Sequence, residues 1–143
     1  FLDKNMKNED PYKEAMRYIE NARDDLKQAG IDGKYYEDEK YVKSASGIAY
    51  SGVLKALDFY FDIKKVPKQK GRKSIEYYQK NLAKIDKKLS KELNTAYTVL
   101  HLEGYYEGQT KIGLIEEGFD SAISIIDAIK PYSKNGVNQT YMN

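Results

Sequence analysis

The sequence of 143 residues contains no cysteine and no tryptophan, and His101 is its only histidine. Without cysteine there can be no disulfide framework, no thiolate nucleophile and no thiolate metal site. One imidazole cannot build a histidine-rich metal centre, so we expect no metal and no other cofactor. The sequence also lacks a glycine-rich phosphate loop, a paired-histidine metalloprotease motif and a nucleophile elbow. These absences favour a protein that is not an enzyme.

The chain also carries little net charge and no long hydrophobic run. Lysine and arginine number 24 against 22 aspartates and glutamates, so the formal net charge of +2 indicates no particular charged partner. The longest uncharged run, 44–54, is rich in glycine and serine and too short to span a bilayer. Since no secretory signal is visible, we expect a cytoplasmic protein without a membrane association.

The stretch from Asp38 to Lys65 has the strongest pattern in the chain. At a helical period its apolar residues form one continuous line, which neighbouring apolar residues widen to an arc of roughly 240°. A helix that is apolar on most of its circumference must be covered by other segments on most sides. We therefore expect this stretch to be the central helix of a bundle. Its apolar line consists of Val42, Ala45, Ala49, Val53, Ala56, Tyr60 and Ile63.

Helical periods also occur on both sides of this central stretch. Residues 11–29 begin with Pro11 directly after Asp10, a pair that suits a helix start, and Gly30 follows them. Residues 112–129 form a final helix that Pro131 ends. Residues 74–104 could form one helix or two.

For residues 74–104 we prefer a break between 86 and 90, because Asp86 and Ser90 can both cap a new helix. The segment Gly104–Gly108 indicates a helix end and a turn. Together the patterns predict an all-α fold, a mainly antiparallel bundle of four or five helices. No useful stretch alternates with the period of a strand.

The domain organisation expected from these patterns is simple. We expect one domain over 1–143, with a core at about 11–130 and a polar tail at 132–143. No internal repeat and no low-complexity tract divides the chain.

The most distinctive charge feature is a basic loop at 64–73, in which six cations and no acid fall within ten residues. The loop leads into a helix start, where backbone N–H groups and basic side chains can hold an anion. The functional interpretation is a phosphate, nucleotide or nucleic-acid backbone contact. The alternative is a solvated connecting loop, which the low net charge and the lack of aromatics within it favour. The candidate anion-binding residues are Lys68, Lys70, Arg72, Lys73 and Ser74.

The polar side of the central helix offers a second candidate surface. Ser44, Gly47 and Ser51 are small and uncharged, where a solvent-facing helix normally carries lysine or glutamate. Small residues at this spacing allow another helix to approach closely. We expect a homodimer whose interface includes these three residues. The alternative is a monomer in which Phe119 and Ile123 of the final helix fill the same groove.

Two further groups of polar residues are candidates for sites of chemistry. His101 lies near Glu103 and Glu107, but no set of nucleophile, base and orienting residue is visible, so we interpret the region as a tyrosine-rich turn. Asp58 and Asp62 lie one helical turn apart and could share a metal ion. Surface ion pairs with Lys55 and Lys65 explain them better.

Two stretches resemble a known family. They read YVKSASGIAYSGVLKALDFYF (41–61) and AYTVLHLEGYYEG (96–108), and the resemblance rests on Ala49–Tyr50, Leu100–His101 and Gly104–Tyr106. They are similar to HEPN-like helical bundles, and within that class to small bacterial families of unknown function. The resemblance covers most of residues 11–130.

Ribonuclease members of that class carry an arginine and a histidine four to six residues apart at the start of a late helix. The arginines here are Arg17, Arg23 and Arg72, and none lies near His101. The resemblance therefore does not imply ribonuclease activity. It implies a bundle that dimerises and binds a nucleotide, a nucleotidyltransferase partner or RNA.

The expected function is a non-catalytic binding or interaction module of unknown ligand. The alternative is a nucleotide- or RNA-binding protein that uses the basic loop 64–73.

Overall fold

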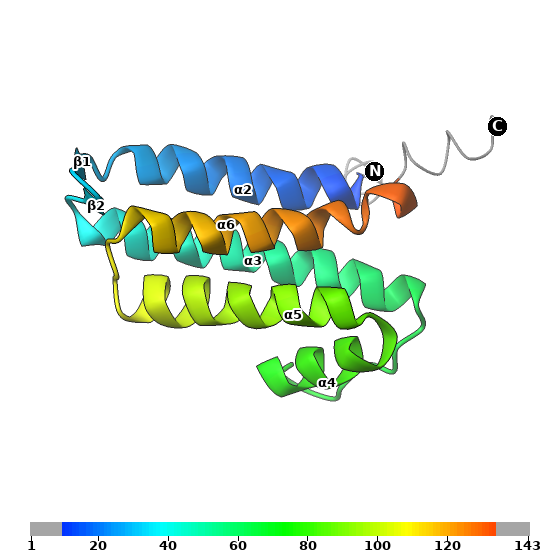
Figure 1. The fold of residues 1–143 in the computed structure, drawn as a ribbon. Helices are drawn as coiled ribbons and strands as arrows, with labels where there is room; N and C mark the ends of the chain where they lie inside the picture. The colour runs from blue at the N-terminus through cyan, green and yellow to red at the C-terminus, as the bar shows by residue number, and fades with distance from the viewer. Residues whose placement is uncertain (1–9, 134–143) are drawn as a thin grey trace.

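The computed structural model describes residues 10–133 of the chain. Four long helical segments, α2, α3, α5 and α6, lie side by side and run in alternating directions (Figure 1). The elements are α2 (Pro11–Lys27), β1 (Ile31–Asp32), β2 (Tyr35–Tyr36), α3 (Glu39–Ile63), α4 (Ile75–Ile85), α5 (Lys87–Ala96), the π-helix η1 (Tyr97–Tyr106), α6 (Ile112–Asp127) and the 3₁₀-helix η2 (Lys130–Tyr132). The predicted all-α bundle is confirmed, with one very small hairpin added.

The helix starts follow the capping residues that the sequence offered. The Asp10 carboxylate accepts a hydrogen bond from the Tyr12 N–H at 2.9 Å, with Pro11 as the first helical residue. Asp86 has an extended backbone and accepts from the Leu89 N–H at 3.0 Å. The preferred break within 74–104 is therefore confirmed, because the extended backbone of Asp86 ends α4 and its carboxylate caps α5.

The central helix is α3, which contacts α2, α6 and η1. Burial follows the predicted arc, and only a narrow side that includes Ser44, Ser51 and Lys55 is exposed. Sequence periodicity was sufficient to predict the burial of α3, because a helix surrounded by three others must be apolar on most sides. The buried residues of α3 are Val42, Ala45, Ser46, Ala49, Tyr50, Gly52, Val53, Ala56, Leu57, Tyr60 and Phe61.

The helix end and turn expected at Gly104–Gly108 are confirmed, although Gly104 itself lies inside the helix. Helix α5 continues directly into η1, and the turn begins only at Glu107, followed by Gly108 with a φ of +67°. Gly104 is buried inside the helix, where an added Cβ would lie 2.6 Å from the Cβ of Ser46. This glycine therefore allows η1 and α3 to approach closely, and it does not stop the helix.

Two more glycines hold the helices at short spacing. A Cβ on Gly52 would lie 2.9 Å from the Cβ of Tyr18 in α2. A Cβ on Gly118 would lie 2.6 Å from a methyl group of Val99 in η1. Because real Cβ atoms do not approach other carbons so closely, side chains at these positions would force the helices apart.

The hairpin of β1 and β2 has only two residues in each strand, too few for a strand period to be recognisable in the sequence. It nevertheless fixes one end of the bundle. The Tyr36 N–H donates to the Thr110 carbonyl at 2.8 Å, and the Ile112 N–H donates to the Lys34 carbonyl at 3.0 Å. These bonds hold the segment between η1 and α6 next to the start of α3.

Of the helices within residues 10–133, none is both long and apolar enough to cross a membrane.

Candidate binding site

An aromatic cluster surrounds the only histidine of the chain. The His101 ring lies 4.9 Å from the Tyr50 ring and 5.3 Å from the Tyr97 ring, measured between centroids, and both pairs are stacked. Tyr105 stacks at 5.9 Å with an interplanar angle of only 13°, and Tyr106 meets the imidazole edge-on at 4.9 Å. These separations fall in the range in which aromatic pairs attract each other.

Three of these rings form what we name the aromatic ladder: Tyr97, His101 and Tyr105. They follow one another at steps of four residues along η1. In an α-helix, residues four apart are offset by about 40° around the axis. The wider turn of a π-helix reduces the rotation per residue, so side chains four apart come closer to lying above one another. The π-helical backbone therefore brings the three rings into register.

Exposure increases along the ladder. Tyr97 and His101 are half-buried, whereas Tyr105 is 46% exposed and its neighbour Tyr106 is 60% exposed. Desolvation lowers the pKa of His101 below its ordinary value of 6.5, so the imidazole is neutral at pH 7. Burial also favours the neutral form of Tyr50, because it raises the pKa of that hydroxyl and keeps it protonated. The cluster is therefore an uncharged stack with one exposed end.

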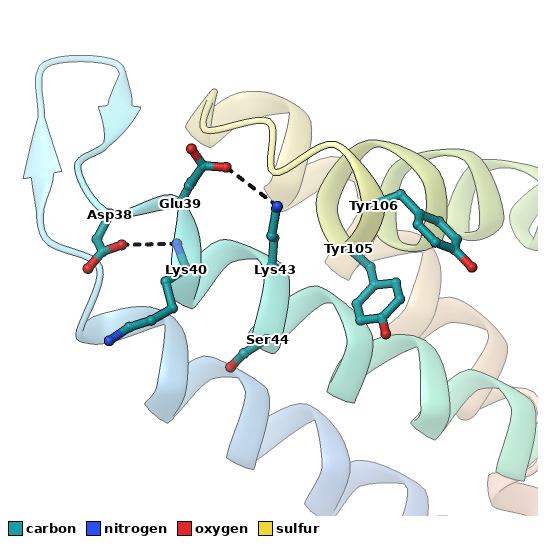
Figure 2. A pocket seen from close by; sticks show the side chains of 7 residues that line it. All are labelled: Asp38, Glu39, Lys40, Lys43, Ser44, Tyr105 and Tyr106. Atoms are coloured by element: carbon teal, nitrogen blue, oxygen red, sulfur yellow. Dashed lines mark hydrogen bonds and ion pairs between the residues drawn. The ribbon is translucent and has the colours of Figure 1, made fainter.

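That exposed end forms one wall of an open groove of about 690 Å³, which we name the aromatic groove. Tyr105 and Tyr106 come from η1 and lie across from the first turns of α3 (Figure 2). The hairpin places the α3 start here, because it ties residues 34–36 to the segment after η1. The groove is lined by Asp38, Glu39, Lys40, Lys43, Ser44, Tyr105 and Tyr106.

The charged groups of the groove are largely matched with each other. The Asp38 carboxylate caps α3 by accepting from the Lys40 N–H at 2.9 Å. The Lys43 ammonium lies 3.7 Å from the Glu39 carboxylate. The Lys40 ammonium lies over the Tyr41 ring, 4.7 Å from its centroid. Two carboxylates and two ammonium groups thus leave the lining without a net charge.

The predicted interface residues Ser44, Gly47 and Ser51 lie beside this groove, and only Ser44 lines it. The Ser44 hydroxyl donates to the Asp25 carboxylate of α2. The Ser51 hydroxyl donates to the Gly47 carbonyl at 3.0 Å. A Cβ on Gly47 would meet the Tyr105 ring at 3.0 Å, so Tyr105 covers this glycine.

Phe119 and Ile123 of the final helix, which were the alternative to a second copy, do not make the nearest contact with Gly47. The three atoms nearest to a Cβ on Gly47 all belong to Tyr105, and none belongs to Phe119 or Ile123. The small residues of α3 therefore receive the end of the aromatic ladder.

At the other end of α3, the fold itself uses three of the five candidate anion-binding residues. The Lys73 ammonium bonds to the Asp58 carboxylate at 3.0 Å, and Lys68 lies 4.0 Å from Asp62. The Ser74 hydroxyl caps α4 by accepting from the Tyr77 N–H at 3.2 Å. Lys70 and Arg72 are exposed, and within residues 10–133 no ion pair involves either of them.

These contacts correct the expected partners of Asp58 and Asp62. Ion pairing is right, but the partners are Lys73 and Lys68 of the basic loop and not Lys55 and Lys65. Asp58 also accepts a hydrogen bond from the Tyr78 hydroxyl at 2.8 Å, which ties α4 to α3. Burial and this bond raise the pKa of Tyr78, and the bond to Asp58 raises the pKa of Lys73.

In the part of the chain that the structure describes, no group of three or more histidine, aspartate or glutamate side chains could hold a metal ion. The sequence predicted a tyrosine-rich turn around His101, but not the ladder. The available signal was the spacing of Tyr97, His101 and Tyr105, each four residues from the next. It was overlooked because Gly104 was interpreted as the end of the helix.

Fold and site define a small helical-bundle domain with an aromatic groove at one end. The family model of a domain of unknown function, DUF5618, matches residues 10–131, and the chain belongs to this family. A solved structure of a protein of unknown function from Dyadobacter fermentans is similar, with 42% sequence identity and a TM-score of 0.77. That match covers 83% of this chain and 93% of the other. No curated protein matches the chain.

Proposed function

We propose that the chain is a non-catalytic binding module and that the aromatic groove is its binding surface. The observation that carries this proposal is the exposure of Tyr105 and Tyr106 at the end of a stack that is otherwise packed. Exposed rings beside a hollow are typical of binding sites, because concave sites combine aromatic walls with a few polar groups. The volume of the groove lies within the range for small-molecule sites.

The polar groups of the groove support binding and not turnover. Glu39 and Lys43 pair with each other, and Asp38 is engaged as a helix cap. Ser44 donates to Asp25, but no histidine lines the groove to act as its base. A nucleophile activated by a neighbouring base is the minimum for covalent catalysis, and the lining residues do not supply this pair.

The proposal includes the wider HEPN-like relationship that the sequence resemblance implies. Its support is the all-helical bundle built around one long central helix, α3. Under this relationship the chain would be a cytoplasmic bacterial protein with a nucleotidyltransferase or a nucleic acid as its partner. A nucleotidyltransferase gene beside this one would support that relationship.

A second candidate function is nucleotide or RNA binding by the basic loop 64–73. The observation that favours it is the exposure of Lys65, Lys70 and Arg72 on one short segment. Phosphate contacts weaken steeply with salt, so RNA bound in this way should be released as the salt concentration rises. The variant Lys70→Glu/Arg72→Glu should lose the retention, and Lys80→Glu, on the surface of α4, is the control.

The proposed function is tested by ligand-observed NMR with a mixed set of small aromatic and aliphatic amides, acids and alcohols. We expect some compounds to bind the unmodified chain and to lose binding to the Tyr105→Ser/Tyr106→Ser variant. Tyr35→Ser removes another exposed tyrosine, 53% exposed, from outside the groove and should leave binding intact. If no compound distinguishes the double variant from the unmodified chain, the proposed function is wrong.

A further inference from the structure

We propose that the aromatic groove binds a neutral, planar aromatic ring that stacks on the outer face of Tyr105 and continues the aromatic ladder. This inference rests on the proposed function, since it assigns a chemical class to the ligand of the same groove.

The geometry of the ladder indicates where such a ring would lie. Its last step, from His101 to Tyr105, is the most nearly parallel, with an angle of 13°. Tyr105 lines the groove and His101 does not, so the groove begins where the ladder ends. Figure 2 shows Tyr105 and Tyr106 of η1 on one side of the groove, and Lys43 and Ser44 of α3 on the other. A flat ring placed on Tyr105 would occupy the next position of the ladder.

Tyr106 gives the position a second wall. Its ring meets that of Tyr105 at 67°, with the centroids 5.1 Å apart. The two rings therefore form a corner, in which a flat ligand can stack on one ring and meet the edge or face of the other. Both arrangements are favourable for aromatic pairs. A saturated ring of equal size would gain neither, because it has no π-face.

The rings of this corner are also held in place before any ligand arrives. His101 supports Tyr105 from behind, and a side chain at Gly47 would collide with the Tyr105 ring, so that ring rests directly on α3. A preorganised ring loses little conformational freedom on binding, which increases affinity. This arrangement distinguishes Tyr105 from an isolated surface tyrosine.

The charges of the lining favour a ligand without a net charge. The ammonium of Lys43 is matched by Glu39, and that of Lys40 lies over Tyr41. An anion would approach Asp38 and Glu39, and a cation would approach the two lysines. A neutral ring avoids both repulsions, and polar groups on its edge can still bond to Ser44 or to the exposed Glu39–Lys43 pair.

The test compares benzamide with cyclohexanecarboxamide, which share an amide and differ in the planarity of the ring. The full chain, with ¹³C-labelled tyrosine rings, is titrated with each compound while its aromatic NMR spectrum is recorded. Benzamide should shift the Tyr105 and Tyr106 signals and bind about tenfold more tightly than the saturated compound, as expected for one stacked ring.

Two variants assign this binding to the face of Tyr105. Tyr105→Leu should weaken benzamide binding about tenfold, whereas Tyr105→Phe keeps the ring and should retain it. An unchanged amide spectrum shows that each variant is folded. Benzoate should bind no more tightly than benzamide, because the two carboxylates of the lining offset its two lysines.

Equal binding of the planar and the saturated amide would overturn the inference, as would full benzamide binding to Tyr105→Leu. Much tighter binding of benzoate would contradict the neutral ligand. If benzamide fails while other compounds still bind and require Tyr105 and Tyr106, the inference falls and the proposed function stands. If no compound binds at these tyrosines, both fall.

Discussion

The two ends of α3 carry the two candidate binding surfaces, and they use their side chains differently. At the C-terminal end, Lys73, Lys68 and Ser74 are engaged by Asp58, by Asp62 and by the start of α4. At the N-terminal end, the charges pair locally and two tyrosine rings remain exposed. A residue type that is suited to binding indicates a site only where the fold leaves it available. By this criterion the aromatic end is the stronger candidate.

The aromatic end depends on the close contact between Gly104 and Ser46. We expect Gly104→Ala to destabilise the fold by about 1–3 kcal/mol, because the new methyl group collides with the Ser46 side chain. Chemical denaturation measures this loss. Gly113→Ala is the matched control, since nothing lies within 4 Å of a Cβ at Gly113, and it should not destabilise the fold.

The double variant Gly104→Ala/Ser46→Gly should recover part of the lost free energy of unfolding, because it removes the colliding side chain. If Gly104→Ala is as stable as Gly113→Ala, the close contact between η1 and α3 is not a requirement of the fold.

The predicted homodimer would use the same end of the molecule, with its interface along Ser44, Gly47 and Ser51 beside the aromatic groove. We propose this dimer for two reasons. Ser44, Gly47 and Ser51 are small, and the charges beside them are balanced, and both features suit an isologous contact. Gly47→Glu should then raise the dimer dissociation constant at least about tenfold, because the new side chain displaces Tyr105 and adds a charge.

Sedimentation equilibrium at micromolar concentration measures this change, with Gly113→Glu, at an exposed and open position, as the control. A monomeric mass for the unmodified chain would exclude the dimer. A dimer that Gly47→Glu does not weaken must have its interface elsewhere.

At the opposite end of α3, Asp58→Ala should destabilise the docking of α4 and the basic loop by about 1 kcal/mol. It removes hydrogen bonds from Lys73 and Tyr78, but Asp58 is partly exposed and water screens the ion pair. Hydrogen exchange should show faster exchange in α4 than in α2. Asp62→Ala, which loses only a 4.0 Å surface pair, should change little. Equal effects of the two substitutions would show that the Asp58 bonds do not hold α4.

The smallest effect concerns the pH dependence of the aromatic end. The folded state holds the pKa of His101 below 6.5, so below that pH the unfolded chain takes up a proton that the folded chain resists. The stability that comes from neutral His101 is therefore fully present above pH 6.5 and is lost as the pH falls toward the lowered pKa.

His101→Phe keeps an aromatic ring in the stack but cannot titrate. We expect the unmodified chain to lose more stability than His101→Phe when thermal unfolding is measured at pH 7.5 and then at pH 5.5. Parallel changes in the two proteins would show that burial in the stack does not disfavour the charged imidazole.

Much of the fold was predictable because its signals are local. The start of a helix depends on residues within one helical turn, such as Asp10, Pro11 and Asp86. The width of the apolar arc of α3 directly indicates how much of that helix other segments cover. Gly104 was interpreted as a helix end because the sequence alone does not distinguish a glycine that ends a helix from one that allows two helices to cross closely. Only the position of Ser46 on another helix distinguishes the two.

The site was predictable to a smaller extent for the same reason. The basic loop was visible as a run of charge, but its pairing with Asp58 and Asp62 requires the tertiary fold. Ser44 was selected for its small size and does line the groove, although it bonds to Asp25 of α2. The four-residue spacing of Tyr97, His101 and Tyr105 was visible in the sequence, but the register of the ladder depends on a π-helical backbone, which no residue pattern in this sequence predicts.

The most direct test of the central claim is to locate binding on the ¹⁵N-labelled full chain by amide chemical shifts. The chain is titrated separately with benzamide and with a short RNA at low and high salt. We expect benzamide to shift signals of residues 38–44 and 101–106, and to leave those of 64–73 unchanged. Benzamide shifts confined to 64–73, or RNA shifts there without any benzamide response at the aromatic groove, would contradict the claim.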